Sequence, residues 1–367
     1  MNKVFVLGGY GNFGQRIVTA LVKSGIPTII AGRNADKANT LASKLIRNHA
    51  HSSIETAIFD IYNEFSKQLA IFTPKVVINT CGPFQLCDYA IAEICIQRNI
   101  HYLDLADGRD FVTGISKLNS HAKSAGVLVV SGASTVPGLS SAVIEKFKHE
   151  FSSIDSVQYG ISPGQKAKRG LATTQSIMTY VGKPLKPFAG SRRAYGWQGI
   201  YRQKYPVLGT RWMANCEIPD LDLFPEHYGI KSIRFSAGME LSFMHLGIWA
   251  MSWLVRLGLP LNLPKKAVLL LAISNWFDFL GTADGGMHLI IKGTDNEARV
   301  KEIRWFIIAK DGDGPQIPTI PAIILAKKLA TGSLTETGAK PCIGMVTLEE
   351  YLAELNEFNI QDFTFKN

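Results

Sequence analysis

The chain has 367 residues, of which 46% are hydrophobic, so it is long enough for two domains with substantial cores. Its five cysteines contain no C-x-x-C pair, which argues against a disulfide framework or a zinc site and favours a reducing compartment. The formal net charge of +9 favours anionic partners, and the apolar stretch at the N-terminus is too short for a secretory signal. We therefore expect a cytoplasmic protein that holds no metal ion.

The first elements in chain order are a predicted strand Val4–Leu7, a glycine-rich turn and a predicted helix from Gln15 to Lys23. The turn fits G-x-G-x-x-G, the pattern with which α/β proteins hold a dinucleotide pyrophosphate at a helix N-terminus. We expect the first glycine to permit a tight turn, the second to let backbone N–H groups approach the phosphates, and the third to let the helix pack closely. The predicted pyrophosphate-binding residues are Gly9, Tyr10, Gly11, Asn12, Phe13 and Gly14.

The end of the second predicted strand, Thr28–Ala31, indicates which dinucleotide is bound. An NAD site usually places Asp or Glu there to bind the ribose hydroxyls, whereas this chain has Arg33. A guanidinium at that point can pair with a 2′-phosphate and stack on adenine. Asn34 adjoins it and Lys37 can add charge, so we predict NADP(H), the alternative being a solvated arginine in a loop.

The rest of the N-terminal part alternates strands and helices. Predicted helices cover Ala35–Arg47 and Tyr89–Ile94, and predicted strands cover Glu55–Ile61, Lys75–Thr80, His101–Leu105 and Val127–Val130. Near-continuous apolar strands between amphipathic helices are typical of a sheet covered on both faces. The pattern predicts an α/β fold with a doubly wound parallel sheet of the Rossmann type.

Ligands of such sheets bind beyond the carboxyl ends of the strands, which selects further candidates. We expect Asp60 to contact adenine and Asp104 to anchor a loop. Asp107 and Tyr102 are the candidates for proton transfer. The residues expected near the nicotinamide are Thr80, Cys81, Gly82 and Pro83.

From about residue 153 the pattern changes to longer strands, which predict a second, α+β domain with a mostly antiparallel sheet. These strands cover Ser156–Ile161, Ile230–Ser236, Gly286–Lys292 and Arg299–Lys310. Two helices follow, over Pro321–Leu329 and Leu348–Leu355.

The segment between Asp155 and Glu217 contains no acidic residue and ten basic ones, among them Lys168 and Arg169. Such a field favours anionic ligands, although a solvated basic face is the alternative. No nucleic-acid recognition module accompanies the charge, so we do not expect nucleic acid as a partner. A cationic, aromatic wall for an acidic small-molecule substrate is predicted at Arg192, Arg193, Tyr195 and Trp197.

Residues 240–280 are unusually apolar, with runs over Leu246–Val255 and Val268–Ile273. Neither run reaches the roughly 20 residues needed to span a bilayer. One interpretation is a buried helical hairpin or an oligomer interface. The other is a hairpin that lies on lipid with Trp249, Trp253 and Trp276 as anchors, a peripheral membrane contact.

Several segments together resemble the saccharopine dehydrogenase-like NADP-binding oxidoreductase family. Besides the glycine turn they are Gly82–Phe84, Tyr102–Gly108, Pro137–Leu139, Gly196–Trp197, Asn215–Phe224 and Gly338–Met345. The resemblance implies a dinucleotide-binding domain over 1–135, completed by the C-terminal segment 315–367, and a substrate and dimerisation domain over 136–314, hence a homodimer. One departure is that Pro137-Gly138-Leu139 is followed by Ser140-Ser141 rather than by an acidic or amide residue, which argues against transfer of the saccharopine activity itself.

The resemblance implies an NADP(H)-dependent oxidoreductase that transfers hydride to a C=N or C=C bond of an acidic or lipid-linked substrate. A non-catalytic NADP(H)-binding or membrane-surface protein is the alternative. The glycine spacing also fits short-chain reductases, but these need Tyr-x-x-x-Lys, and no tyrosine of this chain has a lysine at that distance.

Overall fold

The computed structural model describes residues 2–85, 87–167 and 170–367, so Lys168 and Arg169 of the basic segment lie outside the described residues. The chain divides into two compact units, which are described separately. The first consists of Met1–Ala142 with Gln316–Glu354, and the second of Val143–Pro315 with Leu355–Asn367.

The first unit is built on a seven-stranded sheet in the order β13-β6-β5-β4-β1-β2-β3, in which every pair is parallel. The first six strands follow the order 3-2-1-4-5-6 of a doubly wound dinucleotide-binding fold, which confirms the predicted fold class. The strands are β1 Val4–Leu7, β2 Thr28–Gly32, β3 Ile54–Ile58, β4 Val76–Asn79, β5 His101–Asp104, β6 Leu128–Ser131 and β13 Gly338–Pro341.

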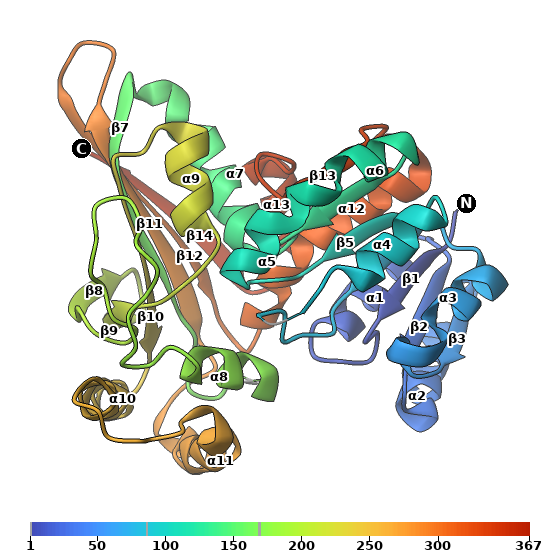
Figure 1. Ribbon diagram of the computed structural model, residues 1–367, viewed down its shortest axis with the longest axis horizontal. Helices are drawn as coiled ribbons and strands as arrows, with labels where there is room; N and C mark the ends of the chain where they lie inside the picture. The colour runs from blue at the N-terminus through green and yellow to red at the C-terminus, as the bar shows by residue number, and fades with distance from the viewer. Residues whose placement is uncertain (1, 86, 168–169) are drawn as a thin grey trace. The chain divides into compact units, whose positions relative to one another are not determined.

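Helices connect and cover these strands (Figure 1). They are α1 Gly14–Lys23, α2 Ala35–Asn48, α3 Ile61–Phe72, α4 Ala90–Gln97, α5 Arg109–Gly114, α6 Asn119–Ser124, α12 Ile320–Thr331 and α13 Leu348–Leu355. The C-terminal helix α12 packs on β4 and β5 beside α1. β1, β4, β5 and β6 are buried along their whole length, as expected for strands with both faces covered.

The predicted C-terminal segment 315–367 is divided between the two units. Strand β13 extends the first sheet beside β6, whereas β14 (Ile360–Lys366) pairs antiparallel with β12 (Val300–Ala309) in the second. The indole N–H of Trp305 also donates to the Asp362 carboxylate at 3.1 Å, which joins the two strands through their side chains. The boundary at the end of the chain therefore lies at residue 355, because the last strand is held by the second sheet.

The second unit contains a mixed seven-stranded sheet in the order β14-β12-β11-β7-β10-β9-β8. β7 and β10 are parallel and all other neighbours are antiparallel, so the prediction of a mostly antiparallel sheet is confirmed. The remaining strands are β7 Ser153–Ser162, β8 Tyr201–Tyr205, β9 Gly209–Asn215, β10 Ser232–Met239 and β11 Gly285–Thr294.

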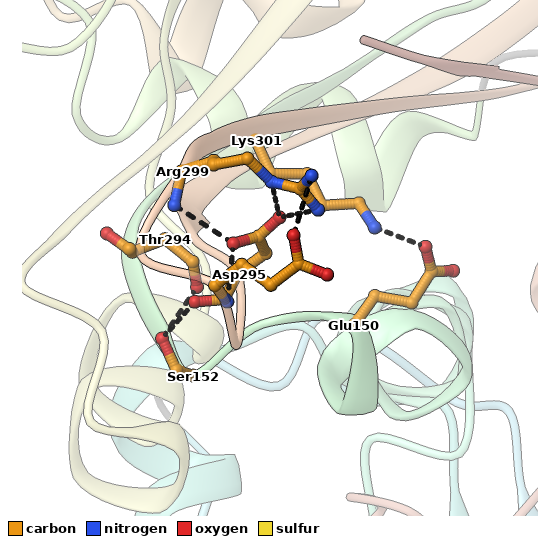
Figure 2. Close-up of polar contacts among 7 residues, drawn as sticks. Glu150, Ser152, Thr294, Asp295, Arg299 and Lys301 are labelled. Carbon is orange, nitrogen blue, oxygen red and sulfur yellow. Dashed lines mark hydrogen bonds and ion pairs between the residues drawn. The ribbon is translucent and has the colours of Figure 1, made fainter.

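Polar contacts hold the turn between β11 and β12 and tie it to the segment before β7 (Figure 2). The Asp295 carboxylate accepts hydrogen bonds from the Arg299 backbone and side chain, each at 2.9 Å. Ser152 donates to the Thr294 carbonyl at 3.0 Å, and Lys301 lies 2.7 Å from Glu150. These bonds fix the register of the hairpin, which carries no functional candidate.

The helices of this part of the chain are α7 Ser140–Phe147, α8 Leu171–Met178, α9 Asp220–Tyr228, α10 Ser242–Arg256 and α11 Ala267–Trp276. α8, α10 and α11 gather at one end of the sheet, near β9 and β10 (Figure 1). Within the described residues, every helix is too short or too polar to cross a membrane.

Candidate dinucleotide-binding site

The glycine turn leaves β1 at the point where the strand order of the sheet reverses. Gly8 has a φ of +70°, and its carbonyl accepts a 2.7 Å hydrogen bond from the Gly11 N–H, which closes the turn. Gly9 instead donates to the Ala31 carbonyl at 3.1 Å and lies against the Ile30 side chain. The residue that needs a left-handed backbone is therefore Gly8, which the sequence interpretation did not name for this role, whereas Gly9 leaves room for close approach to Val6 and Ile30.

Gly14 begins α1 and packs directly on the turn. A Cβ at this position would overlap the carbonyl oxygen of Gly8 and lie 2.8 Å from the Gly9 Cα, so no side chain fits there. The cap residue Phe13 makes no side-chain hydrogen bond to the helix. The N–H groups of Gln15 and Arg16 donate to the Gly11 and Phe13 carbonyls at 3.1 and 3.0 Å, so a diphosphate would bind to the N–H groups of the turn itself. The positive end of the α1 dipole adds to this cradle and also fits a diphosphate.

Arg16 adds a positive charge to this cradle that the sequence interpretation missed. It lies in the first turn of α1, and its guanidinium donates to the Asn12 carbonyl oxygen and, at 2.9 Å, to the Asn12 side-chain oxygen. The sequence contains a signal for this role, because Arg16 is a basic residue two positions after the third glycine, Gly14.

Tyr10 connects the glycine turn to the end of β2. Its ring lies against Gly32, where a Cβ would be 2.5 Å from the Tyr10 Cε1 atom, and its hydroxyl accepts a hydrogen bond from the Asn34 N–H at 2.8 Å. The Asn34 side chain caps α2 by accepting from the Lys37 N–H at 2.9 Å. The structure therefore brings the predicted residues Tyr10, Asn34 and Lys37 together.

Arg33 lies between Gly32 and Asn34 and is exposed. Burial raises the pKa of the Cys81 thiol to about 11, and the positive charge of Arg33 opposes this increase. Arg33 supplies a cation at the edge of the sheet where a 2′-phosphate is expected.

Asp60 is the N-cap of α3, where its carboxylate accepts a hydrogen bond from the Tyr62 N–H at 2.9 Å. This bond gives Asp60 a structural role at the end of β3. An adenine contact by the same side chain stays a prediction.

The end of β4 is clamped to the end of β1 by Thr80, whose hydroxyl donates to the Leu7 carbonyl at 2.7 Å. A Cβ at Gly8 would lie 2.6 Å from the same hydroxyl oxygen, so the two strand ends approach closely. Cys81 donates its N–H to the Asn79 side chain at 3.0 Å. The Cys81 thiol is desolvated although the residue as a whole is exposed, as are Gly82 and Pro83. These exposed residues lie where this fold class binds its ligands.

Asp107 lies in the loop after β5 and is half-buried. Gln85 donates to its carboxylate at 3.0 Å, and desolvation raises its pKa above the ordinary value of aspartate. A raised pKa lets a carboxyl group retain its proton closer to neutral pH, which suits a proton donor.

Asp104, at the end of β5, is fully buried and holds the loops together. Its carboxylate accepts from the Ala106 N–H at 3.0 Å, the Gly132 N–H at 2.8 Å and the Ser131 hydroxyl at 2.9 Å. Burial raises its pKa to about 6, although these donors stabilise the charge. The expected loop-anchoring role agrees with this geometry.

Tyr102 lies in the hydrophobic core of the sheet rather than at its edge. It is 1% exposed and accepts a hydrogen bond from the Asn79 side chain at 3.2 Å, and burial raises its pKa well above 10. Such a group neither reaches a ligand nor releases its proton easily. This correction leaves Asp107 as the candidate for proton transfer and makes Tyr102 a positioning residue for Asn79.

The predicted cationic wall of the second unit is only partly formed. Arg192 and Arg193 are exposed, but Trp197 is buried in a core cluster and its ring packs against His245. Tyr195 stacks under Arg256, whose guanidinium carbon lies 3.9 Å from the ring centroid. Trp197 is thus a core residue, since its indole packs within the cluster and not toward solvent.

No group of three or more His, Cys, Asp and Glu side chains that could hold a metal ion occurs among the described residues. The H-x-H pair His49 and His51 follows α2 and belongs to no such group.

The strand order 3-2-1-4-5-6, with a glycine turn at the point of reversal, defines a Rossmann-type dinucleotide-binding protein. Residues 4–130, about a third of the chain, match the model of the family described as the saccharopine dehydrogenase NADP binding domain. This match confirms the resemblance predicted for the N-terminal domain, including its class of cofactor.

The chain is also similar to individual proteins, and it spans less than a third of the length of the curated relatives that it matches. Eugenol synthase 1 of Petunia hybrida is 31% identical over 87 residues, and phenylcoumaran benzylic ether reductase TP7 of Nicotiana tabacum is 34% identical over 87 residues. Each match covers 24% of this chain and 28% of the relative. Apo saccharopine dehydrogenase (L-Glu forming) from Saccharomyces cerevisiae superposes with a TM-score of 0.66 at 11% identity and 100% coverage of both chains, which shows a shared fold.

Proposed function

We propose that the protein is an NADP(H)-dependent oxidoreductase that transfers hydride to a C=N or C=C bond of an acidic or lipid-linked small molecule. One observation carries the proposal. The Tyr10 hydroxyl links the glycine turn, which forms the phosphate cradle, to Asn34 after β2, and Asn34 lies next to Arg33. The relatives named above are a synthase and a reductase, and the solved neighbour is a dehydrogenase.

The residues present fit a phosphorylated dinucleotide. The turn from Gly8 to Gly14 and the N-terminus of α1 would hold the diphosphate, with Arg16 adding charge. Arg33 and Lys37 would hold the 2′-phosphate. The bound nicotinamide supplies or accepts the hydride.

The remaining work of the protein is to orient the acceptor and to supply a proton. We assign the proton to Asp107, which is half-buried, has a raised pKa and is oriented by Gln85. The exposed Arg192 and Arg193 favour an anionic substrate through their charge. A homodimer and a cytoplasmic location remain predictions of the sequence.

The test is a panel of imine, enoyl and keto acceptors, each mixed with purified protein and NADPH. We expect the absorbance of the reduced nicotinamide to fall with at least one imine or enoyl acceptor. Tight NADPH binding without turnover on any acceptor would instead favour the non-catalytic, NADP(H)-binding alternative.

A further inference from the structure

Helix α10 is apolar on two faces, only one of which packs against the protein. Ile248, Met251 and Val255 face a core cluster shared with α8 and α11. The other face is exposed and uncharged. It consists of residues three or four positions apart, namely Phe243, Gly247, Ala250, Leu254 and Leu257. Because surface helices normally place polar residues outward, we expect another surface to cover this face.

Helix α11 repeats the arrangement. Ala267 and Leu270 belong to the core cluster, while its outward positions are Val268, Leu269, Ala272, Ile273 and Trp276. Three side chains are especially exposed: Leu257 is 74% exposed, Trp276 81% and, just beyond α11, Phe279 74%. We call these outward faces and the two turns that follow them the α10–α11 apolar surface. The hairpin is therefore not buried on all sides.

The charges around this surface have one sign. Residues 241–277 contain no Asp or Glu, but they contain Arg256, Lys265 and Lys266, all exposed. Lys183 adds a fourth cation, since it follows Gly182, which packs against α10 at Val255.

The carboxylates at the two ends of the segment point into the protein. Glu240 lies 3.3 Å from Arg211 and accepts from the Thr282 N–H at 2.9 Å, and Asp278 accepts from the Gln165 side chain at 3.0 Å. The exposed apolar side chains are therefore accompanied by positive charge alone.

The positive charge indicates which kind of partner covers the α10–α11 apolar surface. A symmetric interface with a second copy must be self-complementary, and it would bring together the same cations, none of which has a carboxylate partner among the described residues. An anionic membrane surface complements both properties, because aromatic and aliphatic side chains enter the headgroup region while lysines bind acidic lipids.

We propose that the α10–α11 apolar surface binds the protein peripherally to membranes that contain anionic lipids. Neither helix can cross a bilayer, so the contact is interfacial. This binding is independent of the oxidoreductase proposal, since it involves no residue of the dinucleotide site.

The test is flotation of the full chain with vesicles of phosphatidylcholine, with or without phosphatidylserine. We expect wild type to float with the anionic vesicles. The variant L257S/W276S/F279S removes three exposed anchors, so bound protein should fall by more than about tenfold. The variant K265E/K266E should lose the preference for anionic lipid.

Matched controls are Y62S/V207S/V300S, which removes three exposed apolar side chains elsewhere, and K44E/K67E. Both should float like wild type, and all variants should keep the thermal midpoint of wild type because only exposed side chains change. Absence of flotation by wild type, or equal flotation by L257S/W276S/F279S, would overturn the proposal. A wild-type dimer in sedimentation that this variant converts to monomer, without vesicle binding, would identify a second copy as the occupant and also overturn it.

Discussion

The hydroxyl of Tyr10 accepts a 2.8 Å hydrogen bond from the backbone N–H of Asn34. Tyr10 lies between two glycines of the turn after β1, and Asn34 caps α2 after β2. One side chain thus fixes the phosphate cradle against the segment that carries Arg33. In the proposed function, we expect this contact to set the spacing between the diphosphate and the 2′-phosphate sites.

Replacing Tyr10 by phenylalanine tests the contact. Loss of one hydrogen bond, worth about 0.5–1.5 kcal/mol, should weaken NADPH binding by about threefold to tenfold, as measured by calorimetry. Y62F is the control, since Tyr62 is exposed on α3. Equal affinities of Y10F and wild type would show that the contact does not organise the site.

Arg33→Asp should weaken NADPH binding by about 1–3 kcal/mol, the scale of a charge-assisted contact, and leave NADH binding unchanged. Titration of both coenzymes measures the difference. Arg47→Asp makes the same change of charge on the exposed surface of α2 and should affect neither coenzyme. If R33D weakened both coenzymes equally, Arg33 would not recognise the phosphate.

Gly14→Ala should abolish measurable NADPH binding and lower the thermal midpoint, because its Cβ would overlap the Gly8 carbonyl. Gly247→Ala is the matched control, since a Cβ there meets nothing within 4 Å. It should leave binding intact and stabilise α10 by up to about 1 kcal/mol. Normal NADPH affinity in G14A would contradict the close packing of turn and helix.

The sequence predicted most strands of the first unit because they are short apolar runs. Helix α3 (Ile61–Phe72) was missed, and the strand predicted over Glu55–Ile61 ends at Ile58. Strand β1 and helix α13 have the predicted bounds. Hairpin β8–β9 was missed, since Tyr201–Tyr205 is an edge strand with three polar residues between its two tyrosines and lacks an apolar run. Strand β14 was missed for the same reason, because it is an edge strand with Asp362 and Lys366.

The candidate site was predictable wherever position along a strand decides exposure. Arg33, Cys81 and Asp107 follow the ends of parallel strands, and such ends meet at one edge of the sheet. The predicted roles of Tyr102 in proton transfer and of Trp197 in the substrate wall were wrong. The direction of a side chain depends on tertiary packing, which no local pattern specifies. The same limit applies to Arg256, whose stacking on Tyr195 joins residues far apart in sequence.

His245 gives a prediction for the pH dependence of stability. It is fully buried in α10, neither ring nitrogen has a hydrogen-bond partner among the described residues, and burial lowers its pKa to about 4. Because the unfolded chain binds the proton below about pH 6.5, wild type loses stability as the pH falls from about 6.5 to about 4.

His245→Phe removes this loss while the other buried histidines remain. We compare the free energies of unfolding of H245F and wild type, measured in urea. The value for H245F minus the value for wild type should be larger by about 2 kcal/mol at about pH 5 than at about pH 8. The exposed His51→Gln is the control and should follow wild type. The same difference at both pH values would mean that His245 is not held neutral.

Asp107→Asn should lower turnover by about a hundredfold or more while the NADPH dissociation constant is kept, since general acid catalysis contributes about that factor. Tyr102→Phe should instead keep turnover and lower the free energy of unfolding by about 1 kcal/mol through loss of the Asn79 bond. Steady-state kinetics with an acceptor that oxidises NADPH separates the two roles. The reverse pattern would return Tyr102 to the site and exclude Asp107.

The most direct measurement is a calorimetric titration of wild-type protein with NADPH and NADH, accompanied by thermal unfolding with each coenzyme. We expect one saturable site that prefers NADPH by about tenfold or more, together with a rise of the thermal midpoint. No heat and no shift with either coenzyme would contradict the assignment of the glycine turn as a dinucleotide site.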